Sequence, residues 1–282
     1  MARITQVSIV PNLPLNDGRQ IPQVGFGVFE VPPDQTVDAV LHALKTGYRS
    51  IDTAAAYGNE SEVAEAIARS ELDRSEVFVT TKVWNSEQGR DQARRSLEQS
   101  LSRMRSDYVD LLLIHWPAPS LGLYAETWEA FIEFQREGRA RSIGVSNFTV
   151  EHLQRIIDDT GVVPAVNQIE LHPHFQQPEL RRFHSEHDIV TEAWSPLARG
   201  RALPDPAIGE IATRHGRTPA QVILRWHVQL GSVVIPRSTN PSRIEENFAI
   251  FDFSLSDEEM EAMGRLDESA RVGPDPRTFA AG

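Results

Sequence analysis

The 282-residue sequence contains no cysteine. Disulfide bonds, thiolate nucleophiles and zinc sites with cysteine ligands are therefore excluded. The sequence also has no run of about 18 apolar residues, which a membrane-spanning helix would need. Its first residues, MARITQVSIVPNL, lack the architecture of a signal peptide. We therefore expect a cytoplasmic enzyme.

Basic residues are scarce relative to acidic ones. The chain has 28 Lys and Arg against 40 Asp and Glu, which gives a formal net charge of −12. This balance argues against a nucleic-acid partner, and it requires any anion-binding site to be a local cluster of cations. The apolar fraction of 40% is sufficient for a sizeable core. The length fits a single domain, because α/β barrels commonly reach about 250 residues as one unit.

Short apolar strands alternate with amphipathic helices after an N-terminal β-hairpin. The hairpin is expected at residues 4–22, because Asp17-Gly18 lies between two short apolar runs. Periodicity and turn signals then predict eight strands, at 23–29, 48–53, 77–84, 108–116, 140–146, 165–171, 189–194 and 233–236. Helices are predicted at 34–46, where Asp34 can form the cap, and at 62–69, 91–104, 124–137, 150–159, 178–187, 206–215, 218–230, 241–248 and 256–266.

This alternation, without a linker or a break in composition, predicts a single α/β domain over residues 1–282 that folds as a (β/α)₈ TIM barrel. Extra helices follow the seventh strand and lie near the C-terminus. A doubly wound sheet is the alternative architecture. It is disfavoured because the segment GFGVFE lacks the third glycine of a dinucleotide-binding fingerprint and no P-loop motif occurs.

Four polar side chains are predicted at adjacent strand ends, where a barrel carries its chemistry. Asp52 ends the second strand, Tyr57 follows in its loop, Lys82 lies on the third strand and His115 ends the fourth. A tyrosine phenol has a pKa of about 10, so it is a poor acid at neutral pH unless a cation stabilises its phenolate. Lys82 can be that cation, and Asp52 is its natural partner because a buried lysine is costly to leave unpaired. Tyr57 can then donate a proton, and His115 can orient a substrate carbonyl oxygen.

Several motifs surround these four residues. They include GYRSIDTAAAYGNE, TTKVWN, LLLIHWP, SIGVSNF, VNQIELHP and IPRSTNPSRIEENF, and together they span Gly25 to Phe253. In residues, order and spacing the chain resembles the aldo-keto reductase family, with Asp52, Tyr57, Lys82 and His115 matching its catalytic tetrad. It is most similar to the bacterial 2,5-diketo-D-gluconic acid reductases and their relatives.

The resemblance implies reduction of a carbonyl by hydride from a nicotinamide, with Tyr57 as the proton donor and NADPH as the cofactor. The positions that match cofactor contacts fall into four groups. These are Ser146, Asn147 and Gln168 on the carboxamide, with Trp194 stacked on the nicotinamide; Ser195 and Leu197 at the pyrophosphate; Arg237, Ser238, Thr239 and Arg243 at the 2′-phosphate; and Glu246 and Asn247 at the adenine.

One of these positions departs from the family pattern, because lysine is usual where Arg237 stands. The positive charge is retained, and two arginines beside two hydroxyls at a helix start can hold a phosphate dianion. We therefore expect a preference for NADPH, with room for NADH as a second cofactor.

The resemblance also places Phe29, Trp84 and Trp116, together with His115, around the substrate. The connections after Trp116 (PAPSLGLYAET) and after the seventh strand (LARGRALPDP) are short. They offer little material to enclose a large hydrophobic ligand. We expect small aldehydes and ketones as substrates, including keto-sugars, diketones or α-keto esters, and the resemblance suggests a monomer.

Other functions remain open at this point. A barrel of this kind could bind NADPH in a sensing role with little turnover. A hydrolase or lyase could use Asp52 and Glu170 as acid and base, but that leaves Lys82 and Tyr57 unexplained. Reduction of carbon–carbon double bonds is disfavoured, because relatives with that activity carry glutamate where this chain has His115.

The pair His172 and His174 in LHPHF has no evident third ligand. We therefore predict no metal site and interpret His172 as a hydrogen-bonded residue at a strand end.

Overall fold

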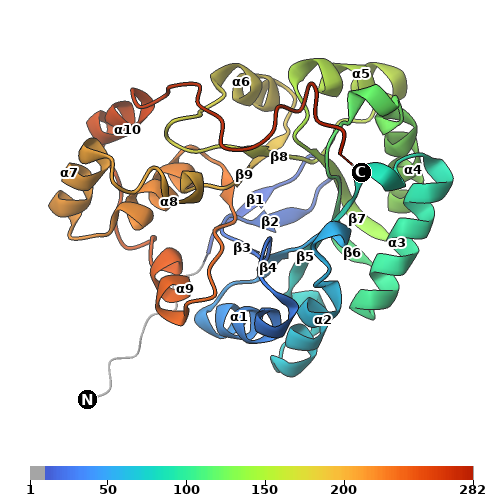
Figure 1. The fold of residues 1–282 in the computed structure, drawn as a ribbon, viewed down its shortest axis with the longest axis horizontal. Helices are drawn as coiled ribbons and strands as arrows, with labels where there is room; N and C mark the ends of the chain where they lie inside the picture. Colours follow the sequence, from blue (N-terminus) through green and yellow to red (C-terminus); the bar gives the residue numbers. More distant parts are fainter. Residues whose placement is uncertain (1–9, 282) are drawn as a thin grey trace.

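A computed structural model of the chain describes residues 10–281. Its main sheet is a parallel barrel in which the strands follow one another in chain order (Figure 1). The strands are β3 (Phe26–Gly27), β4 (Ser50–Asp52), β5 (Phe78–Val83), β6 (Val109–Ile114), β7 (Ala140–Ser146), β8 (Val166–Glu170), β9 (Val190–Trp194) and β10 (Val233–Val234). The predicted (β/α)₈ TIM barrel is confirmed.

The first and last strands meet and close the barrel. Val24 forms a parallel bridge with Val234. The amide of Gly25 donates to the carbonyl of Val234 at 2.9 Å, and the amide of Val234 donates to the carbonyl of Gln23 at 3.0 Å. Closure leaves no free edge on the sheet.

Helices surround the barrel, as Figure 1 shows. They are α1 (Pro33–Thr46), α2 (Glu60–Arg69), α3 (Arg90–Met104), α4 (Tyr124–Arg136), α5 (Val150–Thr160), α6 (Pro178–Glu186), α7 (Pro206–His215), α8 (Pro219–Gln229), α9 (Pro241–Phe248) and α10 (Asp257–Gly264). The predicted extra helices are α7, after the seventh barrel strand, and α10. Within the described residues, no helix is long and apolar enough to cross a membrane.

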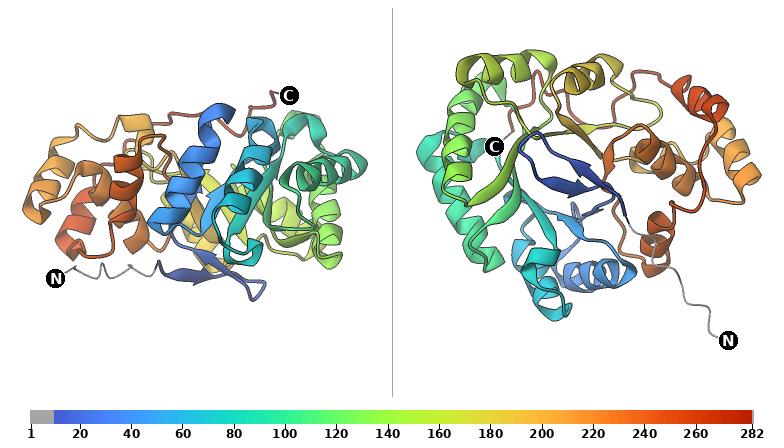
Figure 2. Two further views of the ribbon diagram at one scale, coloured as in Figure 1. Left: turned by 90° about the horizontal axis from the view of Figure 1, so that it is seen from below. Right: turned by 180° about the vertical axis from the view of Figure 1, so that it is seen from behind.

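The hairpin closes the N-terminal end of the barrel. Strands β1 (Asn12–Pro14) and β2 (Gln20–Pro22) pair antiparallel around the predicted turn, in which Gly18 has a φ of 84°. Ile21 is fully buried and clusters with Leu111 and Val233 from the barrel strands. Figure 2 shows the hairpin on the opposite side of the barrel from the C-terminal segment. Positions 4–9 of the predicted hairpin lie outside the described residues.

Some predicted element ends were wrong. Helix α1 begins at Pro33, with Pro32 rather than Asp34 as the cap residue. Proline suits the first helical position, because its φ is already helical and its missing amide would be unpaired there. The first and last strands of the barrel are shorter than predicted, because β3 is limited to Phe26–Gly27 and β10 to Val233–Val234.

Candidate active site

Parallel strand register brings the four predicted side chains together. Asp52 at the end of β4 pairs in register with Thr80 on β5, and Lys82 lies two residues further along the same strand. Because side chains alternate between the faces of a strand, Asp52 and Lys82 point to the same side, into the barrel. Tyr57 ends the short 3₁₀ helix η1 (Ala55–Tyr57) that follows β4, and His115 follows β6.

Lys82 is the centre of the cluster. Its Nζ donates to Asp52 Oδ1 at 2.6 Å, to the carbonyl of Thr53 at 2.9 Å and to the Tyr57 hydroxyl at 3.3 Å. These three bonds use all three ammonium protons. The residue is only 1% exposed. The structure therefore contains the predicted Asp52–Lys82 ion pair, and the Tyr57 hydroxyl is hydrogen-bonded to the same ammonium group.

The electrostatics of the cluster keep Lys82 charged. Burial acts to lower its pKa, but Asp52 and Tyr57 outweigh burial, so the net pKa is raised. Burial raises the pKa of Tyr57 to about 12, while Lys82 acts in the opposite direction. Lys82 therefore lowers the pKa of Tyr57, as predicted. The net pKa of the phenol is nevertheless above its ordinary value, because the effect of desolvation is larger than the effect of one cation.

His115 directly follows β6 and faces Tyr57 across the end of β5. The two ring centroids are 5.6 Å apart in an edge-on arrangement, and the Trp84 ring lies 4.8 Å from the imidazole. Burial lowers the pKa of His115 well below its ordinary value, and the positive charge of Lys82 adds to this. The imidazole is therefore neutral at neutral pH. Its Nδ1 has no hydrogen-bond partner among the described residues.

The residues expected at the carboxamide form one hydrogen-bonded group. Gln168 donates through Nε2 to Asp52 Oδ2 at 2.8 Å and to Glu192 Oε2 at 2.9 Å. Asn147 donates to the His115 carbonyl and to Ser146 Oγ, both at 3.0 Å. Its Oδ1 accepts the indole N–H of Trp194 at 2.8 Å.

This arrangement fixes the orientation of the Trp194 ring. Both amide protons of Asn147 are engaged and its Oδ1 accepts one bond, so these contacts hold the indole and the loop after β6. Glu192 is a member of this group that the sequence reasoning missed. The available signal was one glutamate inside the apolar strand segment IVTEAW.

The predicted phosphate cluster lies at the start of α9. Arg237 and Arg243 are both exposed, and Asn240 caps the helix by accepting from the Arg243 amide at 3.3 Å. Ser238 and Thr239 lie in the connection between them. Among residues 10–281, the one ion pair of Arg237 is a long contact with Glu30, at 3.5 Å. The helix start therefore presents two exposed guanidinium groups and a positive dipole end.

The other predicted cofactor positions have mixed surroundings. Ser195 and Leu197 follow β9 and are partly buried, and Ser195 has a φ of 47°. Glu246 accepts from the cap hydroxyl of Thr218 at 2.8 Å, and Asn247 is buried. Glu246 is therefore already engaged in holding α8 against α9.

The predicted substrate walls are aromatic and come from three different loops. Phe29 is 44% exposed, and its ring lies 5.0 Å from that of Tyr57. Trp84 and Trp116 are joined by Phe279, whose ring centroid is 6.4 Å from Trp84 and 4.5 Å from Trp116. Phe279 was missed by the sequence reasoning, although a phenylalanine in a Gly- and Pro-rich segment after the last helix was a signal.

Comparison with known proteins gives the family. The sequence model of the protein family described as "Aldo/keto reductase family" matches residues 23–268. The chain belongs to the aldo/keto reductase family. It is therefore an oxidoreductase.

Its relatives cover nearly the whole chain. An aldo-keto reductase of Mycobacterium sp. (strain KMS) is 55% identical over 269 residues, which are 95% of this chain and 98% of that protein. The methylglyoxal reductase DkgA of Escherichia coli is 48% identical over 267 residues, 94% of this chain and 96% of that protein. A crystal structure of a Gox0644 mutant in complex with NADPH superimposes with a TM-score of 0.93 at 51% identity, covering 96% of this chain and 99% of that chain.

A buried carboxylate fastens the C-terminal segment of this aldo/keto reductase over the barrel. Glu170, at the end of β8, accepts from the amides of Val272 at 2.5 Å and Gly273 at 3.0 Å, and it pairs with His172 Nε2 at 3.0 Å. Burial acts to raise its pKa, but the bond from His172 and those from the two amides outweigh it, so the pKa is lowered. In Figure 1 the segment crosses the barrel toward the C-terminus.

These contacts bear on two alternatives from the sequence. Glu170 is committed to the C-terminal segment, which weakens its reading as the partner of Asp52 in a hydrolase. His172 is a hydrogen-bonded residue next to a strand end, as predicted, whereas His174 pairs with Asp205 at 3.3 Å. Within residues 10–281, no group of three His, Asp or Glu side chains is arranged to hold a metal ion.

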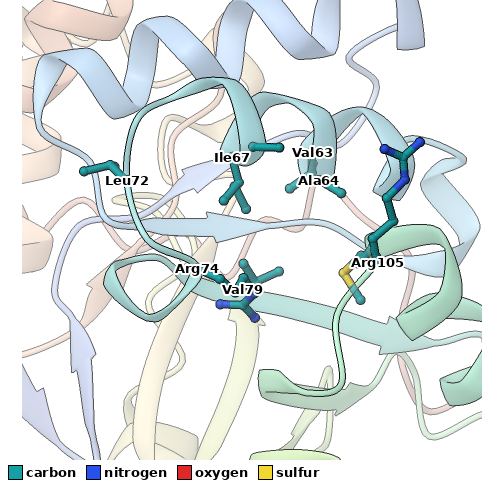
Figure 3. Close-up of a pocket in the computed structure, with 9 residues that line it drawn as sticks. Val63, Ala64, Ile67, Leu72, Arg74, Val79 and Arg105 are labelled. Carbon is teal, nitrogen blue, oxygen red and sulfur yellow. The ribbon is translucent and has the colours of Figure 1, made fainter.

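An apolar pocket lies outside the barrel of the reductase. Figure 3 shows this pocket of about 170 Å³ beside α2, where Val63 and Ile67 face Val79 of β5, and Arg74 and Arg105 lie at its edges. None of the predicted site residues lines it. It is an apolar gap between helices and strand, separate from the tetrad.

Proposed function

We propose that the chain is an NADPH-dependent reductase of small aldehydes and ketones, with Tyr57 as the proton donor. The observation that carries the proposal is the position of Lys82 Nζ, 2.6 Å from Asp52 Oδ1 and 3.3 Å from the Tyr57 hydroxyl. A cation held in this way stabilises a developing phenolate, which a phenol of raised pKa needs in order to act as an acid. A purely structural ion pair would not require a tyrosine hydroxyl at its third donor position.

The residues present fit the cofactor. Arg237 and Arg243 are exposed at the start of α9, where a phosphate dianion would gain charge-assisted hydrogen bonds. Trp194 is held by Asn147, so its ring is already oriented as a flat apolar face for a nicotinamide. NADPH, when bound, supplies the hydride. The NADPH complex of the Gox0644 mutant, which is 51% identical to this chain, supports the same choice of cofactor.

The remaining chemistry falls to this chain's own side chains. Tyr57 gives its hydroxyl proton to the carbonyl oxygen, and Lys82 stabilises the phenolate that remains. Asp52 keeps Lys82 protonated within the barrel. His115, neutral because burial lowers its pKa, donates a ring N–H to the carbonyl oxygen and so fixes its position without adding a second positive charge.

The substrate class follows from the walls of the site. Phe29 lies against Tyr57, Trp84 lies against His115, and Phe279 of the C-terminal segment packs against Trp84 and Trp116. Glu170 fastens that segment over the barrel. Such a site favours compact carbonyls, including α-dicarbonyls and keto-sugars. The name of the DkgA relative, a methylglyoxal reductase, agrees with the same class.

The test is titration of the purified protein with NADPH and NADH, followed by turnover with small aldehydes, diketones and keto-sugars. Binding of NADPH should quench tryptophan fluorescence through Trp194, and absorbance of the reduced nicotinamide should then fall as carbonyl is reduced. Binding without turnover across the whole panel would favour a sensing role instead. Absence of binding for both nucleotides would overturn the proposal.

A further inference from the structure

Glu192 is a buried carboxyl group beneath the proposed catalytic tetrad. It lies in the middle of β9 and is 0% exposed. It pairs in register with Gln168 on β8 and with Val233 on β10. Gln168 lies on the same side of the sheet, because partner residues in parallel strands share a face. A carboxyl group in such a position needs a reason beyond packing.

Hydrogen bonds connect Glu192 to the tetrad. The Gln168 amide nitrogen donates to Glu192 Oε2 at 2.9 Å and to Asp52 Oδ2 at 2.8 Å. The other oxygen of Asp52 accepts from Lys82 at 2.6 Å. One continuous path thus runs from Glu192 through Gln168, Asp52 and Lys82 to Tyr57. Glu192 Oε1 has no hydrogen-bond partner among the described residues.

The charge balance of this group determines the state of Glu192. Asp52 on β4 and Lys82 on β5 already form a neutral pair, while the β10 neighbours Val233 and Val234 are apolar. A second carboxylate would leave an uncompensated buried charge with one bare oxygen, which strongly favours protonation. Burial raises the pKa of Glu192 to about 8; Asp52 adds to the rise, whereas the Gln168 bond and Lys82 oppose it. Glu192 is thus neutral at pH 7, with its proton available on Oε1.

We propose that Glu192 is a positioning residue for the reduction: in its neutral form it holds Gln168, and through it Asp52, in place, and its ionisation impairs proton donation by Tyr57. The inference rests on the proposed reductase function. Ionised Glu192 adds a negative charge that raises the pKa of Tyr57 further and so disfavours the phenolate left after proton transfer. Reduction is therefore close to its full rate at pH 7 and declines as pH rises through the pKa of Glu192.

The test is the pH profile of single-turnover reduction by the NADPH complex, so that product release does not mask the chemical step. The wild-type rate should fall about tenfold between pH 7 and pH 9, because about one molecule in ten retains the proton one pH unit above a pKa of 8. Glu192→Gln has the same shape as the neutral acid and cannot ionise. Its rate should match the wild type at pH 7 and change less than twofold by pH 9.

Glu259→Gln is the matched control, because this largely buried glutamate on α10 pairs with His215 and Arg214 outside the barrel. It should retain the wild-type profile. A parallel fall of the wild type and Glu192→Gln, or no fall in either, would overturn the proposal.

A second measurement does not depend on activity. In wild-type protein labelled with ¹³C at the glutamate carboxyl groups, one resonance should titrate near pH 8, and it should be the resonance missing from Glu192→Gln. If every glutamate titrates below pH 6, the proposal fails even if the variant does not fold. If the wild type shows no turnover at any pH, the reductase function fails, while this titration still decides the state of Glu192.

Discussion

The two ends of the barrel are built from the same strands but with opposite kinds of side chain. At the N-terminal end, Leu111 of β6 packs with Ile21 of the hairpin in an apolar layer. At the C-terminal end, Lys82 of β5 and Gln168 of β8 point into a buried polar layer in which each is hydrogen-bonded to a carboxylate. The apolar layer is stabilised by contact area alone, whereas the polar layer is stable only while its members remain paired.

Substitution of Lys82, in the polar layer, should have the largest effect on stability and turnover. Lys82→Met should lower the free energy of unfolding by about 3–5 kcal/mol, because it leaves Asp52 buried without its cation. Turnover should be lost as well. Urea unfolding measures the stability, and the double variant Lys82→Met/Asp52→Asn should recover much of it without recovering activity. A single variant as stable as the wild type would show that the polar layer does not depend on pairing.

A substitution at the apolar end should change the stability of the fold but not the rate of turnover. Ile21→Ala should lower the free energy of unfolding by about 2–5 kcal/mol through the cavity that it leaves under the barrel. The rate constant per folded molecule should be unchanged, since Ile21 packs in the apolar cluster under the hairpin, at the other end of the barrel. Urea unfolding and active-site-normalised turnover check both parts. A matching loss of rate would mean that the two ends are not independent.

The phosphate cluster should affect cofactor choice. Arg237→Ala removes one proposed charge-assisted partner of the 2′-phosphate, which corresponds to about 1.5–3 kcal/mol, or about tenfold to a hundredfold in NADPH affinity. Affinity for NADH should not change, because it lacks that phosphate. Fluorescence titration with both nucleotides measures this, and Arg265→Ala, at the exposed residue that follows α10, is the control. An unchanged NADPH preference in Arg237→Ala would contradict the assignment of Arg237 to the 2′-phosphate.

The smallest effect is expected at the fastening of the C-terminal segment. Glu170→Gln keeps one acceptor oxygen and loses the charge that binds the amides of Val272 and Gly273. We expect KM for the carbonyl substrate to rise about tenfold, about 1.4 kcal/mol, with little change in kcat, because Phe279 is held less firmly against Trp116. Glu268→Gln, in the same segment but exposed, is the control. Equal KM values for both variants would show that the segment does not depend on Glu170.

The same contrast explains what the sequence could predict. The barrel and the meeting of Asp52 with Lys82 follow from apolar strands of regular spacing and from polar residues at the strand ends, so both were predictable. Glu192 was missed because one glutamate in a strand reads as a solvated side chain. Only the register against Gln168 places it inside the barrel. Burial likewise decided the net pKa of Tyr57, and burial depends on the folded surroundings.

Phe279 could not be placed from sequence for a different reason. Its position depends on the bonds between Glu170 and the amides of Val272 and Gly273, which join positions 102 and 103 residues apart. No local periodicity encodes such a contact. The start of α1 was also mispredicted, because either of two adjacent prolines could precede the first helical residue and the sequence does not distinguish them.

The most direct test of the account is single-turnover reduction by Tyr57→Phe in its preformed NADPH complex. The variant keeps the ring against Phe29 and removes only the hydroxyl bonded to Lys82. We predict a rate about 10²–10⁴-fold below that of the wild type, with NADPH affinity within about twofold, since general acid catalysis contributes that range. A variant that binds NADPH normally and reduces the substrate at the wild-type rate would contradict the assignment of Tyr57 as the proton donor.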